Sequence, residues 1–171
     1  MNSYLRQLAL AVLLTIGPAA ATAQEIALPS KPDMRAVAQS HSVPRGFIGM
    51  FETIVVRHSD GRFEVLYGFI FGNMRRDGLT YAGNDITGTS CEGATVRQPD
   101  KSGLGKVNCT SNGTIVSISP IEIASGVYGK IQGIDAGVVL DISGKQIGTV
   151  ITQWNGWDFP DAMELVRMFK P

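Results

Sequence analysis

The chain has 171 residues and balances 15 Lys and Arg side chains against 15 Asp and Glu side chains, so its formal net charge is zero. A protein that binds nucleic acid through electrostatic attraction usually has a strong basic excess, so nucleic acid is not an expected partner. The length suits one domain that is large enough to bury a core of its own.

Residues 1–23 have the layout of a secretory signal peptide. Arg6 comes before a short apolar run at residues 8–16, and an Ala-x-Ala pattern ends at Ala23. The apolar run is too short to cross a bilayer, which takes about 20 residues. We therefore predict cleavage after Ala23, a mature chain that begins at Gln24 and has no membrane span, and a secreted or periplasmic location.

Residues 24–45 are predicted to be an extended lead-in to a single β-rich domain at residues 46–171. Two prolines before Asp33 exclude a regular helix in the first part of this lead-in. A short helix is expected over Met34–Gln39, because Asp33 is a good N-cap.

A two-residue period begins at Phe47 and predicts β-strands. Apolar side chains alternate over residues 47–56 and again over residues 63–71. Asp60-Gly61 lies between the two runs and predicts a hairpin turn, because Gly accepts the positive φ that a tight turn needs. The second run is apolar on much of both faces, so we expect that strand near the centre of a sheet.

Glycine turns recur along the rest of the chain. Gly78, Gly113 and Gly144 each come before a run rich in β-branched or aromatic residues, which is typical of an antiparallel meander. Other glycines, such as Gly68 and Gly133, lie within predicted strands, where an isolated Gly often marks a bulge or a sharp bend. Such bends favour closure, so the predicted fold is mainly β, a small antiparallel meander barrel or sandwich.

The C-terminal residues predict a short helix. Asp158 is a candidate N-cap, and Pro160 is tolerated in a first turn. Phe159, Met163 and Val166 recur at nearly helical spacing and form an apolar stripe. We expect this helix to pack on the sheet or to plug one end of a barrel.

Cys91 and Cys109 are the two cysteines of the chain, and in an exported protein they predict a disulfide. Closing a ring of about 18 residues would stabilise the fold by roughly 3 kcal/mol, because it lowers the entropy of the unfolded chain. A redox or nucleophilic pair is the alternative. Redox cysteines usually have two residues between them, so the structural bridge is favoured.

No catalytic residue and no metal ligand is predicted. His58-Ser59-Asp60 contains the residue types of a hydrolytic triad, but consecutive side chains cannot form the relay. The two histidines lie in different segments and both cysteines are assigned to the bridge, so neither a metal nor another cofactor is expected. A pair of carboxylates could act as acid and base, and the candidates are Glu52 with Glu64 or Asp135 with Asp141.

Trp154 and Trp157 flank Asn155-Gly156, where the last predicted strand meets the helix. Rings displayed at such a junction could stack on a ligand or anchor a protein partner. The favoured alternative is that both rings cover the end of the barrel or sheet as part of its core.

Together these features predict an exported binding or envelope-associated module rather than an enzyme. Its partner would be an envelope component or a small apolar ligand. The alternative is a small secreted hydrolase that acts on envelope polysaccharide or peptide. A third hypothesis is a structural role in assembly through an exposed edge strand.

Overall fold

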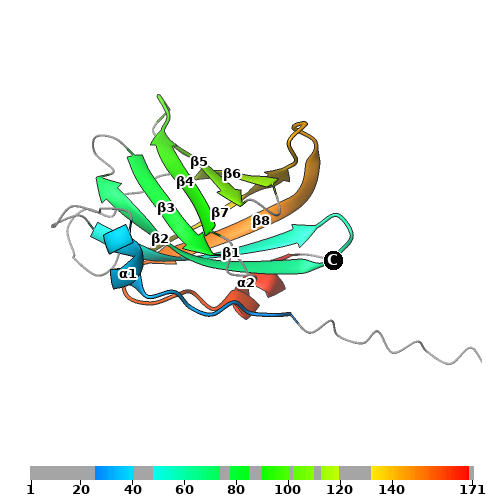
Figure 1. Ribbon diagram of the computed structural model, residues 1–171. Coiled ribbons are helices and arrows are strands. Elements are labelled where there is room, and N and C mark those ends of the chain that lie inside the picture. The colour runs from blue at the N-terminus through cyan, green and yellow to red at the C-terminus, as the bar shows by residue number, and fades with distance from the viewer. Residues whose placement is uncertain are drawn as a thin grey trace, which may run out of the picture.

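The computed structural model describes residues 26–40, 48–73, 78–84, 90–100, 102–109, 113–119 and 132–169. Within these residues eight antiparallel strands follow one another around a closed barrel, and two short helices flank it (Figure 1). The elements are α1 (Met34–Ser40), β1 (Ile48–His58), β2 (Phe63–Asn73), β3 (Gly78–Asn84), β4 (Ser90–Arg97), β5 (Gly103–Cys109), β6 (Gly113–Ser119), β7 (Gln132–Leu140), β8 (Gln146–Asn155) and α2 (Ala162–Met168). The predicted class, a mainly β meander barrel with a short C-terminal helix, is confirmed. The predicted signal peptide lies outside the described residues.

Glycines make the hairpins that the sequence predicts. Gly61 has a φ of 88°, and its amide donates to the carbonyl of His58, which closes the turn between β1 and β2. Gly144 has a φ of 83°, and its amide donates to the carbonyl of Asp141, which closes the turn between β7 and β8. Both residues lie in the left-handed region that glycine adopts without a steric cost.

Pairing of β1 with β8 closes the barrel. Eight residues of β1 pair with β8, from Phe51 opposite Asn155 to His58 opposite Gly148. Closure decides between the two predicted architectures in favour of the barrel. It also removes the free edges that a sandwich would keep, so the described strands offer no edge for the assembly role considered above.

The barrel interior is one of two apolar cores. Side chains from all eight strands meet inside it. Its buried members are Met50, Ile54, Val56, Leu66, Ile70, Leu79, Tyr81, Cys91, Val107, Cys109, Ile115, Val139 and Val150. Strand glycines make room for the largest rings: a Cβ on Gly68 would collide with the Tyr81 ring, and one on Gly133 would collide with the Trp154 indole. The bulge or bend expected at Gly133 is not the irregular point of its strand, because the register between β7 and β8 shifts between Val139 and Leu140.

The second core lies outside the barrel, on β1 and β2. The outward side chains Phe51, Tyr67 and Phe69 pack against Phe159, with ring centroids 5.0–5.2 Å from that of Phe159. Leu165 of α2 is buried in the same cluster, and Met34, Val37 and Ala38 of α1 cover part of it. Figure 1 shows both helices on this side of the barrel. The second strand is therefore buried on both faces, as its composition predicts, although a closed barrel has no central strand.

Helix α2 begins later than predicted, and its N-cap is Asp161 rather than Asp158. The Asp161 carboxylate accepts a hydrogen bond from the Met163 amide at 2.8 Å. Asp158 instead accepts from the amide of Phe159 and lies 3.7 Å from Lys31 Nζ, which links the lead-in to the C-terminal segment. The helix packs on the outer face of the sheet and does not plug an end of the barrel.

Candidate functional site

The interior of the barrel is filled by its own side chains. Barrels of eight strands have an interior just wide enough for such filling. A void of about 10 Å³ lies beside Glu64, Val56 and Ile115, which is room for about one water molecule. This packing leaves no ligand-sized space among the described interior residues, so it favours a function on the surface over the binding of an apolar ligand inside.

A polar cluster lies within that interior. Glu52 on β1 is 7% exposed, and its Oε1 accepts a hydrogen bond of 2.7 Å from the Thr152 hydroxyl on β8. Asp135 on β7 lies directly opposite Thr152 in the ladder. The Tyr81 ring projects from β3 over Gly68, the residue that pairs with Glu52. Four strands, two of them near the start of the barrel and two near its end, thus bring oxygen atoms to one part of the interior.

Burial dominates the electrostatics of this cluster. Loss of hydration raises the pKa of Glu52 from 4.5 to about 8, the Thr152 hydrogen bond partly opposes the shift, and the nearby negative charge of Asp135 adds to it. Burial also raises the pKa of Tyr81, with a smaller contribution from Glu52. Glu52 therefore holds a proton at neutral pH.

The two carboxylate pairs considered from the sequence are not brought together. Glu52 pairs across the ladder with Gly68, whereas Glu64 pairs with Val56. Val56 is the second inward residue of β1 after Glu52, so the two carboxyl groups lie at different levels of the barrel. Asp141 lies in the turn after β7, where its carboxylate accepts from the amides of Ser143 and Lys145. Glu52 and Asp135 form the interior pair instead.

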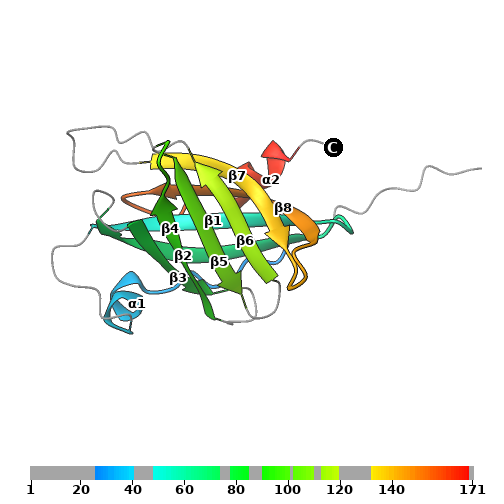
Figure 2. The same cartoon turned by 90° about the horizontal axis from the view of Figure 1, so that it is seen from above.

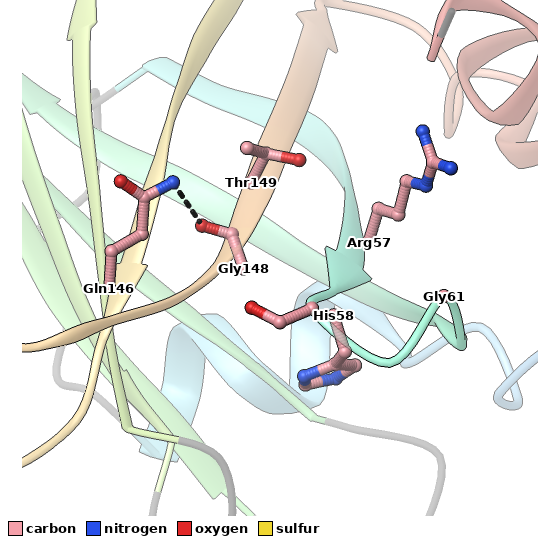
Figure 3. A pocket seen from close by; sticks show the side chains of 7 residues that line it. Arg57, His58, Gly61, Gln146, Gly148 and Thr149 are labelled. Carbon is pink, nitrogen blue, oxygen red and sulfur yellow. Dashed lines mark hydrogen bonds between the residues drawn. The ribbon is translucent and has the colours of Figure 1, made fainter. Parts of the chain in front are cut away.

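A shallow pocket of about 260 Å³ opens at the end of the barrel that holds the turn between β1 and β2 (Figure 3). His58 lines it, and its Nε2 lies 2.9 Å from Glu64 Oε2, with both side chains about nine-tenths buried. Arg57 points away from His58, as alternation along a strand requires. The pocket also contains Ser59 and Gln146, whose amide donates to the Gly148 carbonyl at 3.2 Å.

The outward side chains of β4, β5, β6 and β7 form a surface that we call the open outer face. Figure 2 looks onto these strands, and no helix among the described residues lies in front of them. Val96, Leu104, Ile118 and Ala136 are successive partners across the four strands and form one apolar row. Val96 and Ile118 are 53% and 63% exposed, and Ile134 is also exposed.

The predicted contact residues Trp154 and Trp157 have different environments. Trp154 points inward and packs partly buried against the interior core, as the favoured alternative predicts for it. Trp157 is 53% exposed, so for this residue the core interpretation is wrong. A contact role for Trp157 stays a prediction, and Trp154 is not available on the outer surface.

Cys91 and Cys109 face each other on β4 and β5, with their Cα atoms 4.4 Å apart and their sulfur atoms at disulfide distance. Both side chains are buried inside the barrel, where they join the interior core. This placement fits a structural bridge, because the void beside Cys109 has room for about one water molecule and not for a substrate.

Sequence reasoning did not identify Tyr81, Thr152 or the outer row as functional candidates. A signal for the row was present in the sequence, since Val96, Leu104 and Ile118 are apolar residues on the face opposite to the apolar residues Cys91, Val107 and Ile115 of the same strands. No group of three or more potential metal ligands of the His, Cys, Asp or Glu types occurs within the described ranges.

The fold and these sites define an eight-stranded up-and-down antiparallel barrel with its interior filled and with an outer face on β4–β7 that no described helix covers. No protein-family model matches the chain, and the searches of curated proteins and of solved structures found no match either. Of the helices in the described parts of the chain, none has the length and apolar character to span a membrane.

Proposed function

We propose that the protein is an exported binding module that contacts a protein of the cell envelope through its open outer face. The observation that carries this proposal is the apolar row of Val96, Leu104, Ile118 and Ala136, which the described parts of the chain leave uncovered. Contiguous apolar surface of this kind marks interaction sites on monomeric proteins.

The composition of the open outer face suits a protein partner. Among its described outward side chains, Glu92 and Lys106 are the charged ones, and they have opposite signs. Depletion of charge at the centre, with polar groups at the rim, is typical of protein–protein interfaces. Neither of the two pockets described above opens on this face, so it does not offer the concave site that a small ligand needs.

The apolar row also continues into the outer core. Ala136 pairs with Ile151 of β8, and Ile151 pairs with Val55 of β1. Val55 is fully buried in the cluster that the two helices cover. On β1 and β2 the two helices and the segment at Phe159 cover the outward apolar side chains. A partner bound on β4–β7 would cover the apolar row in the same way.

Export is supported by two independent features. Residues 1–23 have the pattern of a signal peptide, and the Cys91–Cys109 pair suits an oxidising compartment. An envelope protein is therefore the partner class that we propose.

Photo-crosslinking in the native cell tests the surface. A crosslinking residue at Ile118 is expected to give a defined adduct with one envelope protein, whereas the same residue at Thr80, an exposed outward position on β3, gives none. Val96→Lys combined with Ile118→Lys should weaken binding of the captured protein about tenfold or more, with a change in unfolding free energy within about 0.5 kcal/mol. Equal adducts at both positions, or binding unaffected by the double variant, would contradict the proposal.

A hydrolase is the second candidate, and the contact that favours it is the His58–Glu64 pair beside the open pocket. A carboxylate that orients a histidine is a common arrangement for a general base. The Glu52–Asp135 pair does not serve this function, because no described cavity admits a substrate to it. Loss of hydrolysis of envelope polysaccharide or peptide in a His58→Gln variant would support this candidate, and no hydrolysis by the wild-type protein would dismiss it.

A further inference from the structure

Residues 26–40, which we call the strap, cross the outside of the barrel and end in helix α1 (Figure 1). None of these residues is buried, although they lie against the aromatic cluster on β1 and β2. Helix α2 has the same length of seven residues and contributes two buried side chains, Ala162 and Leu165, to that cluster. Burial of apolar area is the main source of stability in such contacts, so the strap is held less firmly than α2.

Exposed contacts join the strap to the C-terminal part of the chain. Lys31 Nζ lies 3.7 Å from Asp158 Oδ1, and the two side chains are 52% and 68% exposed. The same ammonium group lies 5.6 Å from the centroid of the Phe159 ring. Ion pairs and cation–π contacts at exposed sites contribute little to stability, and a helix of seven residues is not stable by itself. The segment before α2 has a firmer attachment, because the buried Thr53 hydroxyl donates to the Pro160 carbonyl at 2.8 Å.

The strap and α2 cover opposite ends of one row of outward side chains on β2. Phe71, near the end of that strand, is 4% exposed, and Met34 of the strap packs in the same cluster. Gly49 of β1 leaves the room for this contact, since a Cβ there would lie 3.3 Å from the Phe71 ring and 3.6 Å from the Met34 methyl group. Phe63, at the start of the strand, packs against Phe169, the C-cap of α2, with ring centroids 5.5 Å apart. Loss of the strap would therefore uncover Phe71 and leave Phe63 covered.

We propose that the strap opens and closes while the barrel and α2 stay folded, and that its opening uncovers an apolar surface around Phe71. Segments with few buried apolar contacts open at a lower free energy than the whole domain, and the strap is such a segment. The surface that it covers lies on β1 and β2, so this device is separate from the open outer face on β4–β7. In the closed state the strap keeps the Phe71 ring from water, and in the open state the ring is available for contact.

Limited digestion of the folded wild-type protein with trypsin tests the strap without any substitution. The bond between Arg35 and Ala36 lies in α1, and the bond between Arg167 and Met168 lies in α2. The two helices have the same length and both arginine side chains are exposed, so the bonds form a matched pair. A bond in a helix is cut when the helix opens, and the cleavage rate therefore reports the population of the open form.

We expect mass spectrometry of the fragments to show cleavage after Arg35 at least tenfold faster than cleavage after Arg167. Low concentrations of urea should leave the faster rate nearly unchanged, because opening of the strap exposes little surface. The same concentrations should accelerate cleavage after Arg167, which requires a larger opening.

Two variants on the same face of β2 separate the strap from α2, and neither alters the residues next to the two bonds. Phe71→Leu removes part of the surface under the strap and should raise the rate of cleavage after Arg35 several-fold, with the rate after Arg167 within twofold of the wild type. Phe63→Leu is the matched control. It should accelerate cleavage after Arg167 and leave the rate after Arg35 within twofold, because Phe63 contacts Phe169.

Two results would overturn the proposal. Equal rates at the two bonds, rising together with urea, would mean that the strap unfolds only with the whole domain. Cleavage after Arg35 as fast as in a synthetic peptide of residues 26–40 would mean that the strap does not dock on the barrel in solution.

Discussion

The unfolding free energy of this protein is expected to fall by about 1.4 kcal/mol for each unit that the pH rises between pH 4.5 and about pH 8. The cause is Glu52, which keeps its proton in the folded barrel while the unfolded chain releases it. Below pH 4.5 the carboxyl is protonated in both states, so its contribution to stability is complete there. That contribution is lost as pH rises through the folded pKa, and the total loss amounts to several kcal/mol.

Chemical denaturation at pH 5, 6.5 and 8 measures this slope, and Glu52→Gln should remove most of it. The variant should be more stable than the wild type at pH 8, because Gln is neutral and its carbonyl still accepts from Thr152. Hydrogen bonds lower the pKa of Asp60, Asp100 and Asp141. These three groups therefore change the unfolding free energy at pH values below about 4, where they make the protein less stable as the pH falls. A wild-type stability that stays constant from pH 5 to 8 would contradict the burial argument.

Phe159→Ala is expected to lower the unfolding free energy by about 3–5 kcal/mol, the usual cost of removing a buried aromatic ring. Phe159 contacts the rings of Phe51, Tyr67 and Phe69 on the outer face of β1 and β2. The same segment is held by a hydrogen bond of 2.8 Å from the Thr53 hydroxyl to the Pro160 carbonyl. The loss should appear in denaturant unfolding, and the α2 amides should lose protection from hydrogen exchange first.

Met168→Ala is the control for this prediction. Met168 lies in helix α2, which follows Phe159 in the chain, and its side chain is half exposed, so its truncation should change the unfolding free energy by less than about 0.5 kcal/mol. If both variants unfolded at the same denaturant concentration as the wild type, helix α2 would not cover the barrel in solution.

Local patterns were sufficient to predict the strands and turns. The alternation over residues 63–71 predicted β2, because successive side chains of a strand point to opposite faces. Gly61, Gly113 and Gly144 were predicted as turn residues, and all three have a positive φ. Asp33 was predicted as the N-cap of the first helix, and its carboxylate accepts from the Arg35 amide.

Long-range placement was not predictable in the same way. Thr152 and Glu52 are one hundred residues apart in the chain, and their hydrogen bond exists because β8 closes on β1. The predicted pairing of Glu52 with Glu64 depended on proximity within one hairpin, and the register places them at different levels of the barrel. A change of one residue in register would have exchanged the inner and outer faces of a strand.

The sequence by itself determined the antiparallel meander and the turns at Gly61, Gly113 and Gly144, because these depend on short-range alternation and on backbone freedom at glycine. It also determined the pairing of Cys91 with Cys109, because the chain has two cysteines and they can form one bridge. Tertiary structure decided which apolar face became the interior, which was covered by α1 and α2, and which stayed open on β4–β7. The physical reason is that alternation separates the two faces of a strand but does not say what each face contacts. Only closure of the barrel and docking of the terminal segments settle those contacts, and with them the positions of Glu52 and Ile118.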